Sequence, residues 1–183
     1  MKSVLTTIKE RKSIRSFSSD PVDAGDLKMI VEAGVWAPNA MNEQKWHFTV
    51  VTDPKMLKKM NEACCLAMAQ SSSQMFHDQA QDPDYNAFYN APAVIVMTSA
   101  KGTFPSFDAG AAAQTICLAA KSLGYDTCVT NSTGMMFDAD PGLKDELGFP
   151  ADQAFICAIV IGKEKDSPAN PFRDRKLDVI QYI

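Results

Sequence analysis

Apolar residues recur every three to four positions in several stretches of the chain, the spacing that predicts helices with one buried face. The helices predicted in this way cover residues 3–10, 23–36, 54–70, 108–123 and 140–148. Ser3, Asp23 and Asp53 each stand directly before such a stretch, where a short polar side chain can accept hydrogen bonds from the first free N–H groups of a helix. Gly124 and Gly148 predict where two of the helices end.

Between the helices lie short runs of β-branched and other apolar residues, which predict strands. These runs cover residues 46–52, 93–97, 125–130 and 155–161. The alternation of strands with helices, taken by itself, predicts a three-layer α/β domain with crossover connections. The sequence contains no linker and no internal repeat, so residues 1–183 are expected to form a single domain.

Residues 71–92 break this pattern because they are mostly polar, and they include the aromatic residues Tyr85, Phe88 and Tyr89. A connection of this length is typical either of a lid over a binding site or of a mobile surface loop, and both interpretations stay open. The three aromatic side chains are expected to join the core.

The composition narrows the class of protein. A net charge of −4 argues against a nucleic-acid surface, for which a basic domain is expected. No apolar run approaches the roughly 18 residues that a membrane helix needs, and no signal peptide is visible, so the cytoplasm is the expected compartment. The chain has 5 cysteines without metal-like spacing, and we expect them to be structural thiols in a reducing compartment.

A basic segment, Arg11–Phe17, follows the first predicted helix. If it is extended, the side chains of Arg11, Ser13 and Arg15 lie on one face, since alternate residues of a strand point to the same side. Two guanidiniums flanking a hydroxyl suit a phosphate, because arginine makes paired charge-assisted hydrogen bonds with phosphate oxygens. The alternative is a solvated basic turn whose cations interact with the C-terminus of the helix.

Two other polar clusters stand out, an amide-rich loop at Pro38–Gln44 and a basic tail at Arg173–Lys176. The chain contains neither a Gly-x-Gly-x-x-Gly motif nor a Walker loop, the two common nucleotide-binding motifs. Its 2 histidines, His47 and His77, belong to no metalloprotease motif, and no nucleophile elbow is present. We therefore predict no catalytic side chain and no metal ligand.

Taken together, these segments resemble one family. The run Arg11–Phe17 resembles the opening motif of the nitroreductase family of FMN-dependent oxidoreductases, and Ala37–Phe48 resembles that family's Pro-Ser-x-x-Asn-x-Gln-Pro-Trp-x-Phe segment. Residues 108–131 are similar to the family's alanine-rich central helix and the strand after it. The chain departs from the family at Asn39, where the family has serine, and at Lys45, where it has proline.

The resemblance implies an FMN site assembled from several parts of the chain. The basic segment would bind the FMN phosphate, the ribityl chain and the pyrimidine edge, and the basic tail would complete the phosphate site. The amide loop would line the flavin ring from the partner subunit, and a polar turn would bring its backbone to the ring. The implied cofactor-binding residues are Arg11, Lys12, Ser13, Arg15, Pro38, Asn39, Ala40, Asn42, Gln44, Thr133, Gly134, Arg173, Arg175 and Lys176. Asn42 and Gln44 would order the amide loop, and Arg175 is the first choice among the tail cations.

The resemblance also implies an α+β fold, a three-layer sandwich in which helices flank a mainly antiparallel sheet. It implies an intertwined homodimer in which Leu177–Ile183 adds an edge strand to the partner's sheet. The implied activity takes hydride from NADH or NADPH onto flavin N5 and passes electrons to a nitroaromatic, a quinone or a similar small acceptor by a ping-pong cycle. No side chain need serve as a general acid, because the flavin carries the chemistry. The alternatives are a flavin-binding or storage protein without turnover and a cofactor-free interaction dimer.

Overall fold

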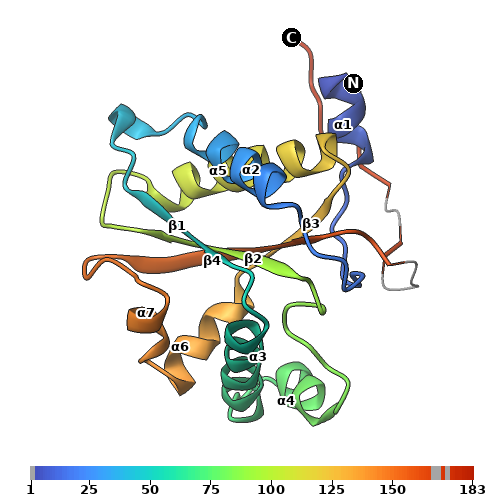
Figure 1. Cartoon of the computed structure of the whole chain (residues 1–183). Helices are drawn as coiled ribbons and strands as arrows, with labels where there is room; N and C mark the ends of the chain where they lie inside the picture. Colours follow the sequence, from blue (N-terminus) through green and yellow to red (C-terminus); the bar gives the residue numbers. More distant parts are fainter. Residues whose placement is uncertain (1–2, 166–169, 172–173) are drawn as a thin grey trace.

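The computed structural model describes residues 3–165, 170–171 and 174–183. Its centre is an antiparallel sheet with the strand order β1-β2-β4-β3. The strands are β1 (Trp46–Val51), β2 (Ala93–Ser99), β3 (Asp126–Thr130) and β4 (Ala154–Gly162). Figure 1 shows helices above and below this sheet, which confirms the α+β three-layer sandwich that the resemblance implied. The α/β prediction from alternation was wrong, because β4 inserts between β2 and β3 and runs antiparallel to both.

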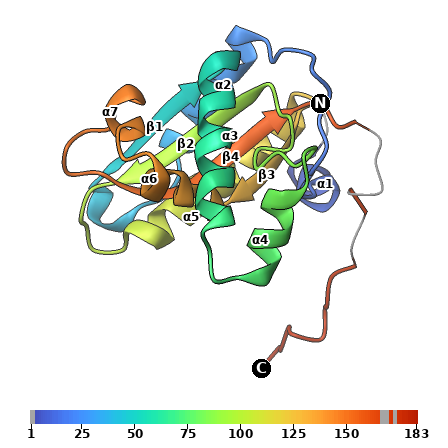
Figure 2. The ribbon, with the colours of Figure 1, turned by 90° about the horizontal axis from the view of Figure 1, so that it is seen from below.

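Helices cover both faces of the sheet. The helices are α1 (Val4–Glu10), α2 (Ala24–Val35), α3 (Pro54–Ala69), α4 (Gln74–Gln81), α5 (Pro105–Ser122), α6 (Met136–Ala139) and α7 (Leu143–Glu146), with short 3-10 turns η1 (Ala40–Asn42) and η2 (Ser132–Met135). In Figure 1, α2 and α5 lie above the sheet, and α3, α4, α6 and α7 lie below it. Figure 2, the view from below, shows α3 crossing the strands.

The two central strands separate two hydrophobic cores. In β2 the side chains of Val94 and Val96 join the core between the sheet and α3, whereas Ile95 and Met97 join the core between the sheet and helices α2 and α5. All four are fully buried. This division follows from the period of two along a strand, and a strand buried on both faces must be apolar at every position. The continuous apolar run of β2 therefore predicts its central place.

The predicted helix caps are confirmed. The Ser3 Oγ accepts a hydrogen bond from the Thr6 N–H at 3.2 Å, and the Asp23 carboxylate accepts two from the first turn of α2. Asp53 does the same for α3. Each cap satisfies N–H groups that a helix start leaves without partners.

Two expectations about residues 71–92 and α1 need correction. Residues 71–92 are not a loop throughout, because α4 occupies part of them and packs on α3. Val4 and Leu5 of α1 were expected on a buried side, yet both side chains are 71% exposed. The predicted aromatic core is confirmed at Phe88, which is buried.

The cysteines and the termini complete the picture. All five cysteines are free, and four of them are buried. Residues 177–183 are exposed and form no strand in the single chain, so the predicted strand exchange with a partner stays a prediction. Among the described residues, none of the helices combines the length and the hydropathy of a membrane span.

The close packing of α2 on α5 yields a test of this core. A Cβ added at Gly34 would lie 2.7 Å from both Cγ1 and Cδ1 of Ile116. We expect Gly34→Ala to lower the free energy of unfolding by about 1–2 kcal/mol, because overpacking outweighs the better helix propensity of alanine. Urea unfolding measures the change. Glu32→Ala, on the exposed side of the same helix, is the control and should alter stability by less than about 0.5 kcal/mol. A Gly34→Ala variant as stable as the wild type would contradict the packing.

Candidate functional site

The basic segment lies along the edge of the sheet. It leaves α1 at Arg11 and runs beside β3, where Ser13 forms a bridge with Thr127 and the Ile14 N–H donates to the Thr127 carbonyl at 3.0 Å. Ile14 and Phe17 are buried and fix the segment to the core. The segment runs beside the sheet as the phosphate hypothesis requires, but strict alternation does not extend to its end, because Phe17 would share a face with Arg15 and yet is buried.

Arg11, Ser13 and Arg15 all influence one thiol of β3. Burial raises the pKa of the Cys128 thiol, and the charge of Arg15, the hydroxyl of Ser13 and the charge of Arg11 act against that rise. Burial also raises the pKa of Tyr89, against the charge and a hydrogen bond of the Arg15 side chain. Tyr89 therefore belongs to the surroundings of Arg15, whereas the sequence predicted only that Tyr89 joins the core.

Cations from both ends of the chain line one hollow of about 510 Å³. Its lining residues are Ile8, Lys9, Arg11, Gln114, Asp174, Arg175 and Leu177. Three of these side chains are cationic and one is a carboxylate, so the hollow carries an excess of positive charge. A phosphate is bound by several converging donors, so this hollow is the candidate phosphate site.

The predicted cations lie in different surroundings. Arg11 and Arg175 meet in this hollow, whereas Lys176 is exposed and does not line it. Arg173 lies outside the described residues. Lys12 turns to the C-terminal segment, where its Nζ donates to Glu164 Oε1 at 2.9 Å and to the Asn170 carbonyl at 3.0 Å. Lys9 was not predicted, although its place in the last turn of α1, next to Arg11, was a usable signal.

The amide loop is held in an unusual backbone conformation. Met41, Asn42 and Gln44 have φ values of 53°, 53° and 48°. For a residue other than glycine, this left-handed conformation costs about 1–2 kcal/mol, so other contacts must maintain the loop. Asn39 Oδ1 accepts from the Gln44 N–H at 2.9 Å, and the Gln44 amide donates to Asn42 Oδ1 at 3.2 Å. The hydrogen bond between the side chains of Asn42 and Gln44 is consistent with their predicted role in ordering the loop.

A buried carboxylate of α5 anchors the same loop. Asp108 is 9% exposed, and its Oδ1 accepts from the Ala40 N–H at 3.0 Å. Pro38 precedes this contact and is exposed. Sequence analysis placed Asp108 only at a helix start, and no local pattern predicts that its partner lies in the amide loop.

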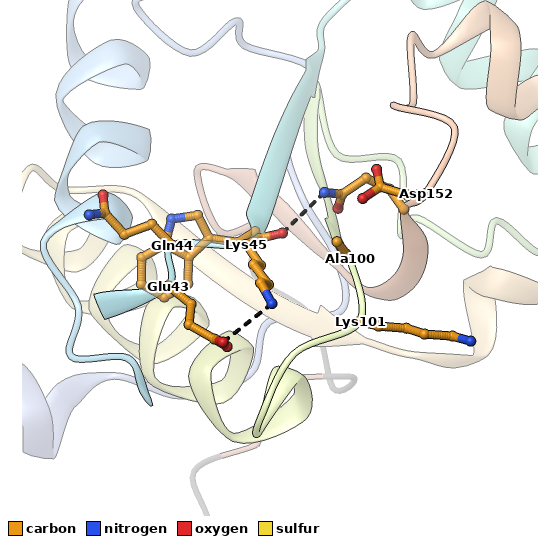
Figure 3. Close-up of a pocket in the computed structure, with 8 residues that line it drawn as sticks. Glu43, Gln44, Lys45, Ala100, Lys101 and Asp152 are labelled. Carbon is orange, nitrogen blue, oxygen red and sulfur yellow. Dashed lines mark hydrogen bonds and ion pairs between the residues drawn. The ribbon is translucent and has the colours of Figure 1, made fainter. Parts of the chain in front are cut away.

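Beside the amide loop is a second hollow, of about 640 Å³ (Figure 3). Glu43 pairs with Lys45 at 3.2 Å, and the Gln153 amide donates to the Lys45 carbonyl at 3.1 Å, as the dashed lines show. The pKa of Glu43 is lowered, first by a hydrogen bond from the Thr103 backbone and then by Lys45. The lining holds two carboxylates and two ammonium groups, so it has no charge excess for a phosphate.

The polar turn after β3 is a 3-10 turn packed against an aromatic ring. A Cβ added at Gly134 would lie 2.5 Å from Cδ1 of Phe155, so the close packing requires glycine there. Thr133 is buried, and its Oγ1 has no hydrogen-bond partner among the described residues. An unsatisfied buried hydroxyl is a candidate for contact with a ligand.

Comparison with known proteins identifies the family. The model of the Nitroreductase family matches residues 8–163. The chain belongs to the nitroreductase family. A relative from Archaeoglobus fulgidus, provisionally named an NADH dehydrogenase/NAD(P)H nitroreductase, is 30% identical over 91% of this chain and 88% of its own.

Two solved nitroreductases are similar over the whole chain, and both contain FMN. The protein from Bacteroides fragilis is 28% identical, with a TM-score of 0.91 and coverage of 100% of both chains. The protein from Desulfitobacterium hafniense is 29% identical, with a TM-score of 0.91 and coverage of 100% of this chain and 99% of that one. This agreement places the chain within the nitroreductase fold.

The anchor at Asp108 can be tested directly. We expect Asp108→Ala to speed hydrogen exchange of the amide-loop N–H groups, because the Ala40 N–H loses a charged acceptor worth about 1.5–3 kcal/mol. Asp108→Asn keeps an acceptor oxygen and should restore most of the protection. Hydrogen exchange followed by mass spectrometry measures the protection of the amide loop in both variants, with β2 as the internal reference. Unchanged exchange in the amide loop of Asp108→Ala would show that the anchor contributes nothing.

Proposed function

We propose that this chain is an FMN-dependent NAD(P)H oxidoreductase that reduces a small organic acceptor. The observation that carries the proposal is the cationic hollow in which Arg11 and Arg175, from opposite ends of the chain, line one space. A nitroreductase fold that gathers cations at the edge of its sheet has a place for the phosphate of a flavin nucleotide. The FMN reported in the Bacteroides fragilis and Desulfitobacterium hafniense proteins supports the same cofactor here.

The residues present fit this cofactor. Arg11, Arg175 and Lys9 line the hollow and would hold the phosphate, and Ser13, two residues beyond Arg11, would donate beside them. Arg15 would lie at the pyrimidine edge, where a cation favours the reduced, negatively charged flavin. Arg173 and Lys176 remain further cations of the proposed phosphate region, whereas the Lys12 ammonium pairs with Glu164.

The proposed ring site uses the amide loop and the polar turn. Pro38, Asn39 and Ala40 would line the ring, and Asn42 and Gln44 hold that loop in shape. Thr133 and Gly134 would approach the ring with backbone and hydroxyl groups. When bound, FMN supplies the N5 atom that accepts hydride from NADH or NADPH and returns the electrons to the acceptor in a ping-pong cycle.

We further propose a homodimer in which the amide loop serves the partner's flavin. The amide loop and the basic segment line no common hollow among those described in the single chain. Large apolar side chains are exposed on α1, at the start of α5 and along the tail, namely Val4, Leu5, Phe107, Leu177, Val179 and Tyr182. Burial of these side chains would supply the driving force for association.

The acceptor is proposed only by class. A nitroaromatic or a quinone is flat and apolar and would stack in the ring site after the nicotinamide has left. Both NADH and NADPH are admitted as reductants. The second candidate function, flavin storage without turnover, would use the same phosphate contacts but would not reduce the flavin.

A visible spectrum tests the proposal. We expect the purified protein to show flavin absorbance and to be bleached under anaerobic conditions by NADH or NADPH, because hydride transfer removes the absorbance of oxidised flavin. Addition of a quinone should restore the colour. Bound flavin that neither nucleotide bleaches would favour storage. Protein that does not take up added FMN would contradict the proposed site.

A further inference from the structure

Asn170 is a buried residue in a C-terminal segment that is otherwise exposed. Its side chain is 5% exposed, whereas residues 174–183 are all exposed. Asn170 belongs to no strand or helix. A polar side chain enclosed outside regular structure needs hydrogen bonds to offset its lost hydration.

The Asn170 side chain makes those bonds with two neighbouring stretches of backbone. Its Oδ1 accepts from the Arg15 N–H at 2.6 Å. Its Nδ2 donates to the Ser16 carbonyl at 3.4 Å and to the Lys165 carbonyl at 3.1 Å. One amide thus uses its acceptor and both of its donors.

The backbone of Asn170 is held as well. Its carbonyl accepts from Lys12 Nζ, and the same ammonium pairs with Glu164, which follows β4. The Lys12 ammonium therefore donates two hydrogen bonds, one to Glu164 and one to Asn170. We call this set of contacts, made by Lys12, Glu164 and Asn170, the tail clamp.

The tail clamp joins the two parts of the chain that carry Arg11 and Arg175. Asn170 is tied to Arg15, a few residues along the extended basic segment from Arg11. On the other side it precedes Arg175 by a few residues. Arg11 and Arg175 line the same hollow. A contact that ties Asn170 to the basic segment therefore acts on the stretch of chain that leads to Arg175.

We propose that Asn170 is a positioning residue that places Arg175 at the FMN phosphate, and that Lys12 serves this clamp rather than the phosphate. The proposal rests on the proposed function, since it concerns the phosphate site of that function. Asn170 touches neither cofactor nor substrate. Its effect passes through Arg175.

Discrimination between FMN and riboflavin tests the proposal, because the two ligands differ only by the phosphate. Flavin-free full-length protein is titrated with each ligand by flavin fluorescence, and the ratio of the two dissociation constants is compared among variants. We expect Arg175→Ala to lower the preference for FMN by about tenfold or more, the order expected for one lost charge-assisted contact. Asn170→Ala should lower it by a similar factor.

The double variant decides whether Asn170 acts through Arg175. If it does, Asn170→Ala/Arg175→Ala should show no smaller preference for FMN than Arg175→Ala alone. Multiplicative losses, or an unchanged preference in Asn170→Ala, would overturn the proposal while leaving the FMN site in place. A wild type that binds riboflavin as tightly as FMN would instead overturn the phosphate site itself, and the proposal with it.

Two further variants separate a change in FMN preference from a loss of stability or folding. Tyr125→Phe removes the hydrogen bond that the hydroxyl donates to Asp26 and the one it accepts from the Asp23 N–H, and it should lower stability without altering the preference for FMN. Should Asn170→Ala fail to fold, Asn170→Asp keeps an acceptor for the Arg15 N–H but turns a carboxylate toward two carbonyl oxygens. It should lose the preference for FMN in the same way.

Discussion

The fold depends on one constraint, the burial of β2 and β4 on both faces. A strand pair covered by helices above and below must place apolar side chains at every position, and it leaves polar groups only at its ends and at the sheet edges. Ile95 and Ile159 pack toward α5, while Val94 and Val160 pack toward α3. The two cores therefore fix the helices on either side, and the sites of chemistry must lie where the sheet stops.

The basic segment occupies such an edge. It pairs with β3 and with the chain beyond β4, through the bridges of Ser13 with Thr127 and of Phe17 with Glu164. Buried Ile14 and Phe17 hold it there. Arg15 lies between them in the sequence and is exposed, so its guanidinium is presented at the edge of the sheet. The tail reaches this edge by a different device, the buried amide of Asn170.

Much of the fold could be predicted from the sequence because its signals are local. The caps at Asp23 and Asp53, and the alternation from Arg11 to Arg15, each involve residues a few positions apart. Strand order was beyond reach, since the place of β4 between β2 and β3 is set by contacts between distant strands. The helix α4 was missed because its sequence is polar, although Phe76 and Ala80 stand at helical spacing.

The candidate site divides in the same way. Arg11, Ser13 and Arg175 could be proposed from the nitroreductase-like motifs. The partners of Asp108 and Asn170 could not, because a single carboxylate or amide has no signature until the fold brings its partner to it. Lys12 has a place in the motif that predicts a phosphate contact, and no local pattern predicts that its ammonium pairs with Glu164.

The central claim is that cations from both chain ends enclose the FMN phosphate, and phosphorus NMR of the FMN-loaded protein tests it most directly. Free FMN takes up a second phosphate proton near a pKa of about 6. Converging guanidiniums favour the dianion and should hold the phosphate pKa well below that value. We therefore expect the phosphorus resonance of bound FMN to keep its dianionic position from about pH 8 down to about pH 5. A resonance that titrates like that of free FMN would contradict the claim.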